Sequence, residues 1–325
     1  MSLPELMARL NDGAVRIADQ MEEDAAALGV VASRLGNGSR ILDAGVRAAG
    51  SHAAARLYAE ACTGGMSRVR TGVRALGPAT LTEARIEVDA PFAACLGAQY
   101  AGWKVAVGRY FAMGSGPARA LAASEPLFER FPDLRCRAAR TVLLLESDSL
   151  PGEEVAEEVA RRCGIKPADL TLIAAPTGSL VGSTQVAARS VETALHKLLE
   201  LGFDLTTIVA GCGACPIAPG HPDSLQAIGR TNDAVLYGAE VSLWTDAPDE
   251  AIEAILERVP SSASREHGRL FYDLFREHGD FYRIDPMLFS PARVTFINAA
   301  TGRVFAAGRI DEPTLLRSFG LTAGA

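Results

Sequence analysis

The sequence predicts an α/β fold in the broad sense, of the α+β type with mixed sheets. Segments with apolar residues at helical spacing are interspersed along the chain with short strand-like segments and hairpin patterns. The length of 325 residues, of which 48% are hydrophobic, allows about two domains.

The opening of the chain predicts a helix, a strand, a helix and two further strands. Apolar residues recur at helical spacing over 4–29, and a turn followed by a strand is expected over 37–46. The segment 52–65 predicts a helix that ends at two glycines. The segments 67–76 and 83–90 alternate as half-buried strands do.

A second block begins near Pro91 and continues the mixture. Its expected strands are 104–114, 140–147, 170–176 and 206–211. Its expected helices are 115–123, 151–164 and 179–202, the last being a long helix or a helix pair.

The last block adds helices, one further strand and a hairpin. Helices are expected over 224–238, 247–260, 268–278 and 312–321. A strand is expected over 240–246, and 292–310 predicts a hairpin that turns at Thr301-Gly302.

We expect two tightly packed domains. The larger α+β domain would combine 1–88 with 204–325, and an inserted α/β domain would span 89–203. No low-complexity linker separates them, so the junction should be close rather than a tether.

Composition excludes several classes of function. The formal charge of -7 argues against a nucleic-acid partner, which would need a basic patch. No window of about 18 apolar residues lacks a charge, and the first residues lack the pattern of a signal peptide. Six scattered cysteines indicate no disulfide framework, so we expect a cytoplasmic protein.

Two of these cysteines, Cys212 and Cys215, form a C-x-x-C motif. Such a pair is either redox-active, half of a zinc site, or simply two partly buried thiols in a tight loop. No second pair of ligands occurs at matching spacing, which favours the thiols, and we expect no metal.

A first candidate site is the glycine-containing turn where the predicted helix 115–123 begins. It contains Gly114, Ser115, Gly116, Pro117 and Arg119. Two glycines let a backbone approach a ligand, and the following helix would offer amides to an anion or carbonyl. The motif lacks the third glycine of a dinucleotide fingerprint and the Gly-Lys-Ser/Thr of a P-loop. An ordinary tight turn is the alternative.

A second candidate site lies on the helix 179–202. Arg189, Glu192 and His196 are three and four residues apart, so they share one face. A guanidinium beside a carboxylate holds that carboxylate ionised and oriented. The alternative is a solvated salt bridge, but the uncharged stretch 179–188 before it favours a helix that enters the interior.

Two further segments contain candidate binding residues. Asn232 and Asp233 could bond an amide or amidine edge of a heteroaromatic ring, or simply support a helix turn. Ser262 lies in a small-residue segment before His267 and Tyr272. No G-x-S-x-G elbow accompanies this Ser/His pair, so the aromatic residues are core, or a wall for a flat ring.

Taken in order, these segments resemble methenyltetrahydromethanopterin cyclohydrolases. The resemblance runs from about residue 10 to 321 and therefore covers almost the whole chain. The segments that carry it are NGSRILDAGV, LYAEACTGG, LGAQYAGW, VAVGRYFAMGSGPARAL, LPGEEV, APTGSLVGSTQVAARSVE, PIAP followed by PDSL, GRTNDAVLYG, VPSSAS, GRLFYDLFRE and SFGL.

The resemblance implies a function and a site. Members of this family reversibly hydrolyse the methenyl cation of tetrahydromethanopterin to an N5-formyl product, without metal, nucleotide or prosthetic group. It also implies two packed α+β domains with a pocket between them, and a homo-oligomer, described as a trimer for archaeal members. The family's catalytic arginine and glutamate match Arg189 and Glu192.

The resemblance also suggests a source and a mechanism. Few lysines and no salt-adapted surface are typical of a bacterial member, for which formaldehyde oxidation in methylotrophy is expected. Glu192 would take a proton from water and Arg189 would orient it. The Gly114–Arg119 turn and Asn232/Asp233 would hold the pterin. Two alternatives remain: another pterin-dependent formyl-transfer or deformylase enzyme, or a non-catalytic pterin-binding protein.

Overall fold

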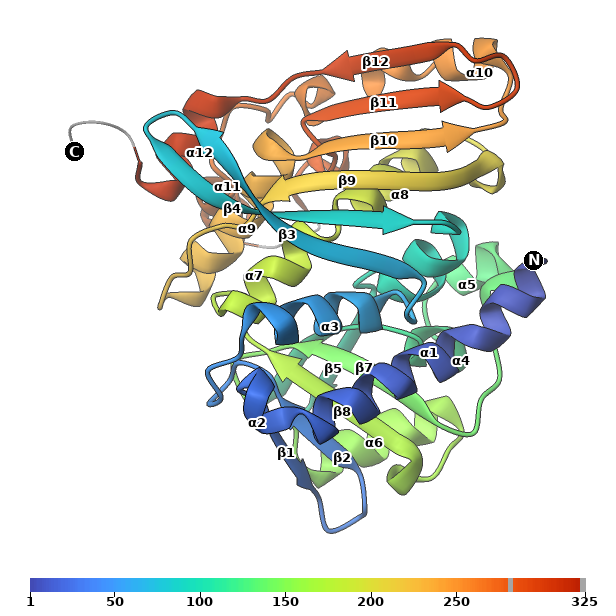
Figure 1. Cartoon of the computed structure of the whole chain (residues 1–325), viewed down its shortest axis with the longest axis vertical. Coiled ribbons are helices and arrows are strands. Elements are labelled where there is room, and N and C mark those ends of the chain that lie inside the picture. The colour runs from blue at the N-terminus through green and yellow to red at the C-terminus, as the bar shows by residue number, and fades with distance from the viewer. Residues whose placement is uncertain (280–282, 322–325) are drawn as a thin grey trace. The chain divides into compact units, whose positions relative to one another are not determined.

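The computed structural model describes residues 1–279 and 283–321, which divide into two compact units. Unit 1 consists of 1–68 and 93–185, and unit 2 consists of 69–92 and 186–325. In the described ranges each unit contains one six-stranded sheet (Figure 1). The predicted mixture of helices with mixed sheets is confirmed.

The elements of unit 1 begin with a long helix and alternate thereafter. Its helices are α1 (Leu3–Glu23), α2 (Ala25–Leu28), α3 (His52–Cys62), α4 (Ala118–Ala122), α5 (Leu127–Arg130) and α6 (Glu153–Cys163). Its strands are β1 (Val31–Arg34), β2 (Arg40–Asp43), β5 (Trp103–Val107), β6 (Tyr110–Ser115), β7 (Thr141–Glu146) and β8 (Leu170–Ala175). A π-helix (Phe92–Gln99) and α7 (Leu180–Ala187) lie at the limits of the unit.

The sheet of unit 1 has the order β1-β2-β8-β7-β6-β5. Strands β2, β8 and β7 are parallel, and the outer strands join them antiparallel. Helices α1 and α3 cover one face, while α4 and α6 cover the other. Because both faces are covered, β7 reads as a continuous apolar run, Val142 to Leu145.

Unit 2 combines the first long hairpin with the C-terminal half of the chain. Its strands are β3 (Ser67–Leu76), β4 (Ala79–Val88), β9 (Ile208–Pro216), β10 (Glu240–Thr245), β11 (Arg293–Asn298) and β12 (Val304–Gly308). Its helices are α8 (Ser190–Glu200), α9 (Ser224–Gly238), α10 (Asp249–Glu253), α11 (Phe271–His278) and α12 (Glu312–Phe319).

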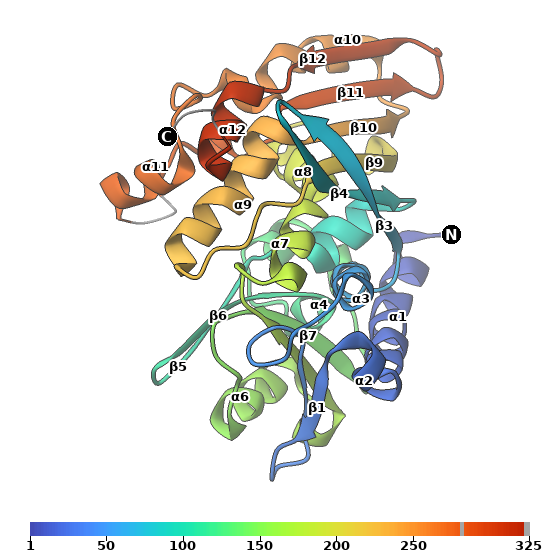
Figure 2. The ribbon, with the colours of Figure 1, turned by 60° about the vertical axis from the view of Figure 1, so that its left-hand side comes forward.

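The sheet of unit 2 has the order β12-β11-β10-β9-β4-β3, with one parallel pair, β10 and β11. Helices α8 and α9 pack on β9, and α11 and α12 pack on α9. Figure 2 shows these helices on the same side of the sheet. One covered and one open face explain why burial alternates along β10 and β11.

The boundaries of the units differ from the expected 1–88 plus 204–325 and 89–203. Strand β2 pairs with β8, and α1 and α3 pack on β7, so the first 68 residues join 93–185. The hairpin of β3 and β4 instead extends the sheet through β9. Pairings between strands so distant in the chain leave no local signal in the sequence.

Three local expectations also need correction. The expected single strand 104–114 is a hairpin, because Gly108 turns the chain with φ 58°. The expected helix 247–260 is reduced to α10 and a short 3₁₀ turn. The π-helix (Phe92–Gln99) was not anticipated, since its small apolar residues have no distinct periodicity.

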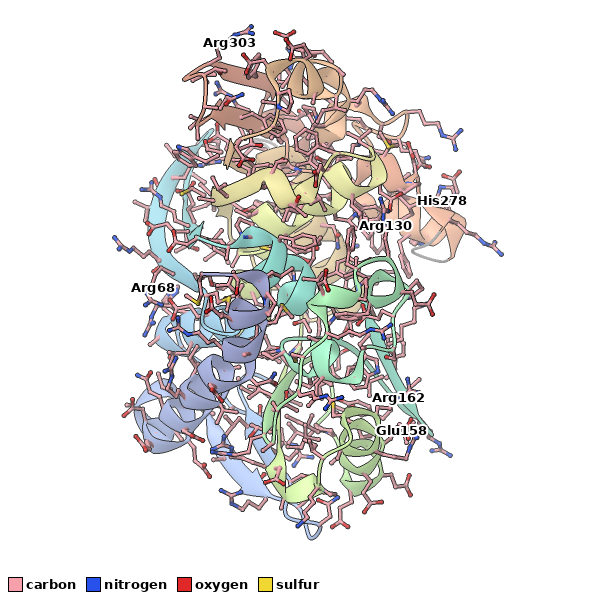
Figure 3. All side chains as sticks on the ribbon, turned by 90° about the vertical axis from the view of Figure 1, so that its right-hand side faces the viewer. Arg68, Arg130, Glu158, Arg162, His278 and Arg303 are labelled. Carbon is pink, nitrogen blue, oxygen red and sulfur yellow. The ribbon has the colours of Figure 1, made fainter. Side chains whose placement is uncertain are left out.

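The surface carries many arginine–carboxylate pairs, as the composition suggests. On α6, Glu158 accepts from Arg161 and Arg162, at 2.9 and 2.7 Å (Figure 3). Exposed pairs of this kind contribute at most about 1 kcal/mol each, so the stability of the units comes mainly from their cores.

Close packing of α1 on the turn after α3 leads to the first prediction. A Cβ added at Gly13 would lie 2.0 Å from the carbonyl oxygen of Gly64. Helix propensity alone would make Gly13→Ala stabilising by about 1 kcal/mol. We expect the clash to prevail, lowering the free energy of unfolding in urea by about 1–3 kcal/mol.

Gly152→Ala is the matched control, because no atom lies within 4 Å of an added Cβ there. Because Gly152 is the N-cap residue of α6, where alanine is less favourable than glycine, its free energy of unfolding should fall by less than about 1 kcal/mol. Equal effects of the two substitutions would contradict the packing described for Gly13.

Candidate active site

The predicted catalytic pair lies at the start of α8. Arg189 is the N-cap residue, and its carbonyl accepts from the Thr193 amide at 2.8 Å and from the Thr193 hydroxyl at 3.0 Å. Glu192 is the third residue of the helix and therefore lies in its first turn. The segment 179–202 is thus a helix pair, α7 and α8, interrupted just before Ser190.

The two side chains form a buried ion pair. Arg189 Nη1 lies 3.6 Å from Glu192 Oε2, and the side chains are 10% and 7% exposed. A distance of 3.6 Å is an electrostatic contact rather than a hydrogen bond. The guanidinium and the helix N-terminus both carry positive charge that offsets the negative charge of a carboxylate at this position.

The glycines of β9 allow α8 to lie close to the sheet. A Cβ at Gly213 would be 2.2 Å from the Ser190 hydroxyl oxygen, and one at Gly211 would be 2.8 Å from a Val191 methyl carbon. Ser190 and Val191 lie in the first turn of α8, directly after Arg189. The two glycines of the GCG sequence in β9 therefore let the N-terminal turn of α8, which holds the ion pair, pack closely against the strand.

The same strand explains the C-x-x-C motif. Cys212 and Cys215 both lie within β9 rather than in the tight loop that the sequence suggested. Residues three apart on a strand project from opposite faces, and Cys215 is buried while Cys212 is partly exposed. Two thiols on opposite faces cannot form a disulfide with each other or share one metal ion.

The turn Gly114–Pro117 connects β6 to the short helix α4. Gly116 has a φ of 103°, a backbone conformation that favours glycine, and its amide donates to the Ala98 carbonyl at 2.8 Å. The Ser115 hydroxyl donates to the Cys62 sulfur at 3.3 Å. These polar groups have partners within unit 1, and the role of the turn in ligand binding stays a prediction.

Arg119 follows the turn and is fully buried in unit 1. Its guanidinium bonds both Glu125 oxygens, at 2.8 and 2.6 Å, and donates to the carbonyls of Leu96 and Ala98 at 3.1 Å each. This geometry differs from the predicted contact with substrate. The side chain instead links the end of the π-helix to the segment that contains Glu125.

Asn232 and Asp233 also bond within their own unit. The Asn232 amide donates to the Ile228 carbonyl at 2.9 Å. Asp233 is 1% exposed and accepts from the Phe271 amide at 2.9 Å and from the Ser318 hydroxyl at 2.6 Å. It therefore joins α9 to α11 and α12, and burial raises its pKa to about 7.

Tyr272 and Ser262 remain accessible in unit 2. Gly229 of α9 lies directly against Tyr272, where an added Cβ would be 2.9 Å from the tyrosine Cβ. The Tyr272 ring is partly exposed, with the Arg276 guanidinium 5.6 Å from its centroid. Ser262 is exposed, beside a buried Ser261 whose hydroxyl donates to the Leu236 carbonyl at 2.5 Å. Asp233, Gly229 and Tyr272 thus belong to one packed region of α9 and α11.

A further polar cluster escaped the sequence analysis. Glu146 is the last residue of β7; its carboxylate accepts from the Thr177 hydroxyl and, at 3.1 Å, from the Gln185 amide. The signal that would have found it is a carboxylate directly after the apolar run of β7, together with the threonine that follows β8.

Two kinds of feature are absent from the described part of the chain. Residues 1–279 and 283–321 contain no group of three or more His, Cys, Asp or Glu side chains arranged to hold a metal ion. Over the same residues, no helix has the length and apolar character needed to cross a membrane.

Comparison with known proteins gives a consistent result. The sequence profile of the family described as "Cyclohydrolase (MCH)" matches residues 9–319. A methenyltetrahydromethanopterin cyclohydrolase of Xanthobacter autotrophicus is 46% identical over 94% of this chain and 90% of its own length. Proteins of the same name from Methanospirillum hungatei and Methanothermobacter marburgensis are each 42% identical over 97% of this chain, and over 99% and 100% of their own lengths.

The buried position of Arg119 yields a prediction about stability. Arg119→Met leaves the Glu125 charge without a partner, so we expect the free energy of unfolding to fall by about 3–5 kcal/mol. Adding Glu125→Gln removes that charge and should restore part of the loss, which urea unfolding of the single and double variants measures. A stable Arg119→Met variant with only weakened substrate binding would instead support the predicted substrate contact.

The raised pKa of Asp233 predicts a pH dependence of stability. The ordinary pKa of this carboxyl is 3.8, so between that value and about 7 the folded protein retains a proton that the unfolded chain has lost. The resulting stabilisation is complete below the unfolded value and is lost as the pH rises through 7. From pH 5 to 8 the wild type should lose about 2–3 kcal/mol more than Asp233→Asn, measured by urea unfolding. Parallel pH profiles would contradict the assignment.

Proposed function

The chain belongs to the cyclohydrolase (MCH) family, and from this membership we propose that it reversibly hydrolyses the N5,N10-methenyl-tetrahydromethanopterin cation to N5-formyl-tetrahydromethanopterin. The observation that carries the proposal is similarity along nearly the whole chain to relatives of that name. The buried pair of Arg189 and Glu192 supports it, since this pair can supply the proton transfers that the reaction requires.

The first step is the addition of water. The methenyl carbon lies between two nitrogens and carries delocalised positive charge, so it is already electrophilic. Glu192 accepts a proton from water while the water oxygen bonds to this carbon, giving a neutral carbinol. Arg189, 3.6 Å from Glu192, holds the carboxylate ionised and in place and stabilises the developing oxygen charge.

The second step breaks the bond between the carbon and N10. Protonated Glu192 donates its proton to N10 as this bond breaks, and the regenerated carboxylate accepts the carbinol hydroxyl proton as the formyl C=O forms. That proton then passes to solvent. The sum is one cation and one water giving the N5-formyl compound and one proton.

The other parts of the proposal follow from the same chemistry. Because the substrate supplies its own electrophile, we propose that no metal or cofactor takes part. The backbone of Gly114–Pro117 and the exposed faces of Asn232, Ser262 and Tyr272 would contact the substrate carrier. Arg119 and Asp233 would act indirectly, by holding the segments that bear these groups.

We also propose the biological setting that the family resemblance suggests. The protein would act in the cytoplasm as a homo-oligomer, a trimer by analogy with archaeal members. The reaction would belong to one-carbon metabolism, in the oxidation of formaldehyde by a methylotrophic bacterium.

Substitution of Glu192 tests the mechanism. Glu192→Gln keeps the shape of the side chain and removes the base, so we expect kcat to fall by roughly 100- to 10,000-fold. Arg189→Ala should lower kcat more than it raises KM. Both are measured from the decay of the methenyl absorbance with no formyl acceptor present.

Glu200→Gln is the matched control, since Glu200 lies on the same helix with a side chain that is 43% exposed. It should retain wild-type kcat. A Glu192→Gln variant with near-normal kcat would contradict the assignment. Tight binding of the substrate by the wild type, with no decay of absorbance, would identify a pterin-binding protein instead.

A further inference from the structure

Unit 1 has a pocket whose lining includes none of the candidate site residues described above. Its volume is about 330 Å³, which is within the range of small-molecule sites. All of its lining residues lie in 1–68, on α1, on α3 and between α3 and the start of β3. The charged and polar side chains among them are Arg16, Gln20, Arg56, Glu60 and Arg68. We propose that this pocket binds a phosphate group of a small anionic ligand.

The charge of the lining is positive. Arg16, Arg56 and Arg68 contribute three positive charges, and among the described lining residues Glu60 is the one carboxylate, so two positive charges remain. Glu60 is already engaged by Arg56, whose Nη1 lies 2.9 Å from Glu60 Oε2. Within 1–279 and 283–321, neither Arg16 nor Arg68 has a carboxylate within ion-pair distance. Guanidinium groups around one pocket repel one another, and a bound anion would offset that repulsion.

A phosphate group matches both the charge and the donors of the pocket. At neutral pH a phosphate monoester carries nearly two negative charges and three acceptor oxygens. Each guanidinium presents donors in a planar fork that can bond two of those oxygens at once. Because the three arginines belong to three different segments, they can bond different oxygens of one phosphate. A single carboxylate has less charge and fewer oxygens, so it fits this set less well.

The local sequence explains why the pocket is open. On α1, Gly13, Arg16, Ile17 and Gln20 recur at helical spacing and therefore line the pocket from one face of the helix. Opposite them in the lining is Gly65, whose φ of 74° favours glycine. A Cβ at Gly65 would lie 3.4 Å from Ile17 Cδ1, so a larger side chain there would take up space beside α1.

Hydrogen bonds fix the turn that forms one wall of the pocket. The Gly65 amide and the Thr63 hydroxyl both donate to the Glu60 carbonyl, each at 2.8 Å. The hydroxyls of Thr63 and Ser67 are 2.6 Å apart, and Arg68 Nη1 donates to the Ser67 carbonyl at 3.2 Å. The wall is therefore in place before a ligand arrives, which reduces the ordering that binding requires.

The pocket is larger than one phosphate ion. A water molecule takes about 30 Å³ of liquid volume, so the five heavy atoms of a phosphate ion fill less than half of the pocket. Ile17 and Leu57 add apolar surface to the lining. The remaining space can therefore hold either a second phosphate or an organic group attached to the first one.

Calorimetric titration of the full chain tests the site, with inorganic phosphate, pyrophosphate and phenyl phosphate as ligands at one ionic strength. We expect one ligand to bind per chain. A tighter complex with phenyl phosphate would identify an organic phosphate as the ligand, and a tighter complex with pyrophosphate would identify an inorganic one. The titration contains no methenyl substrate, so its result does not depend on the proposed hydrolysis.

The double variant Arg16→Gln with Arg68→Gln should bind these ligands at least about 10-fold more weakly, because charge-assisted hydrogen bonds are lost. Both side chains are exposed, and their replacement leaves the ion pair of Arg56 and Glu60 intact, so the variant should fold. Gln20→Glu is a second variant, which adds a negative charge to the lining. It should weaken binding at least about threefold if the double variant does not fold.

The matched control is Arg109→Gln with Arg130→Gln, which removes the same charge from two other exposed positions of unit 1. Figure 3 shows Arg68 and Arg130 well separated within this unit. The control should bind like the wild type. Equal weakening by both double variants would mean that net charge alone attracts the anion, and the proposal would be wrong.

Two further results would overturn the proposal. One is a wild-type protein that binds none of the three ligands. The other is a wild type that does not bind them and a variant, Arg16→Gln with Arg68→Gln, whose oligomeric state differs in sedimentation. That result would show that the arginines contact another protein chain rather than a phosphate.

Discussion

The site depends on one buried electrostatic contact, the pair of Arg189 and Glu192 at the start of α8. A charge with only 7–10% of its side chain exposed is stable only when a partner and a favourable dipole offset its desolvation. The helix N-terminus provides that dipole for Glu192, and Arg189 provides the partner. A lysine would not serve equally, because a guanidinium presents several donors in one fixed plane, whereas an ammonium is a compact, strongly hydrated point charge.

Glycines in strand β9 leave the space that the start of α8 needs to pack against the sheet of unit 2. Strand β9 carries glycines where α8 approaches, and side chains at Gly211 and Gly213 would push Ser190 and Val191 away. Asp233 acts similarly for the helices on the same side, because one carboxylate joins α9, α11 and α12. In both cases a single kind of residue, a glycine or a buried carboxylate, sets the positions of the helices around it.

Sequence reasoning predicted the mixed fold, most elements and the pairing of Arg189 with Glu192, because helical spacing and strand alternation are local properties. It failed where pairing between distant strands decides the fold. Strand β2 lies beside β8, and the boundaries of both units therefore differ from those expected. For Arg119 and Asp233 it predicted ligand contacts, which stay predictions, and it did not foresee their internal partners. Their residue types are suited to binding a ligand. Only their burial and hydrogen-bond partners show that Arg119 bonds within unit 1 and Asp233 within unit 2.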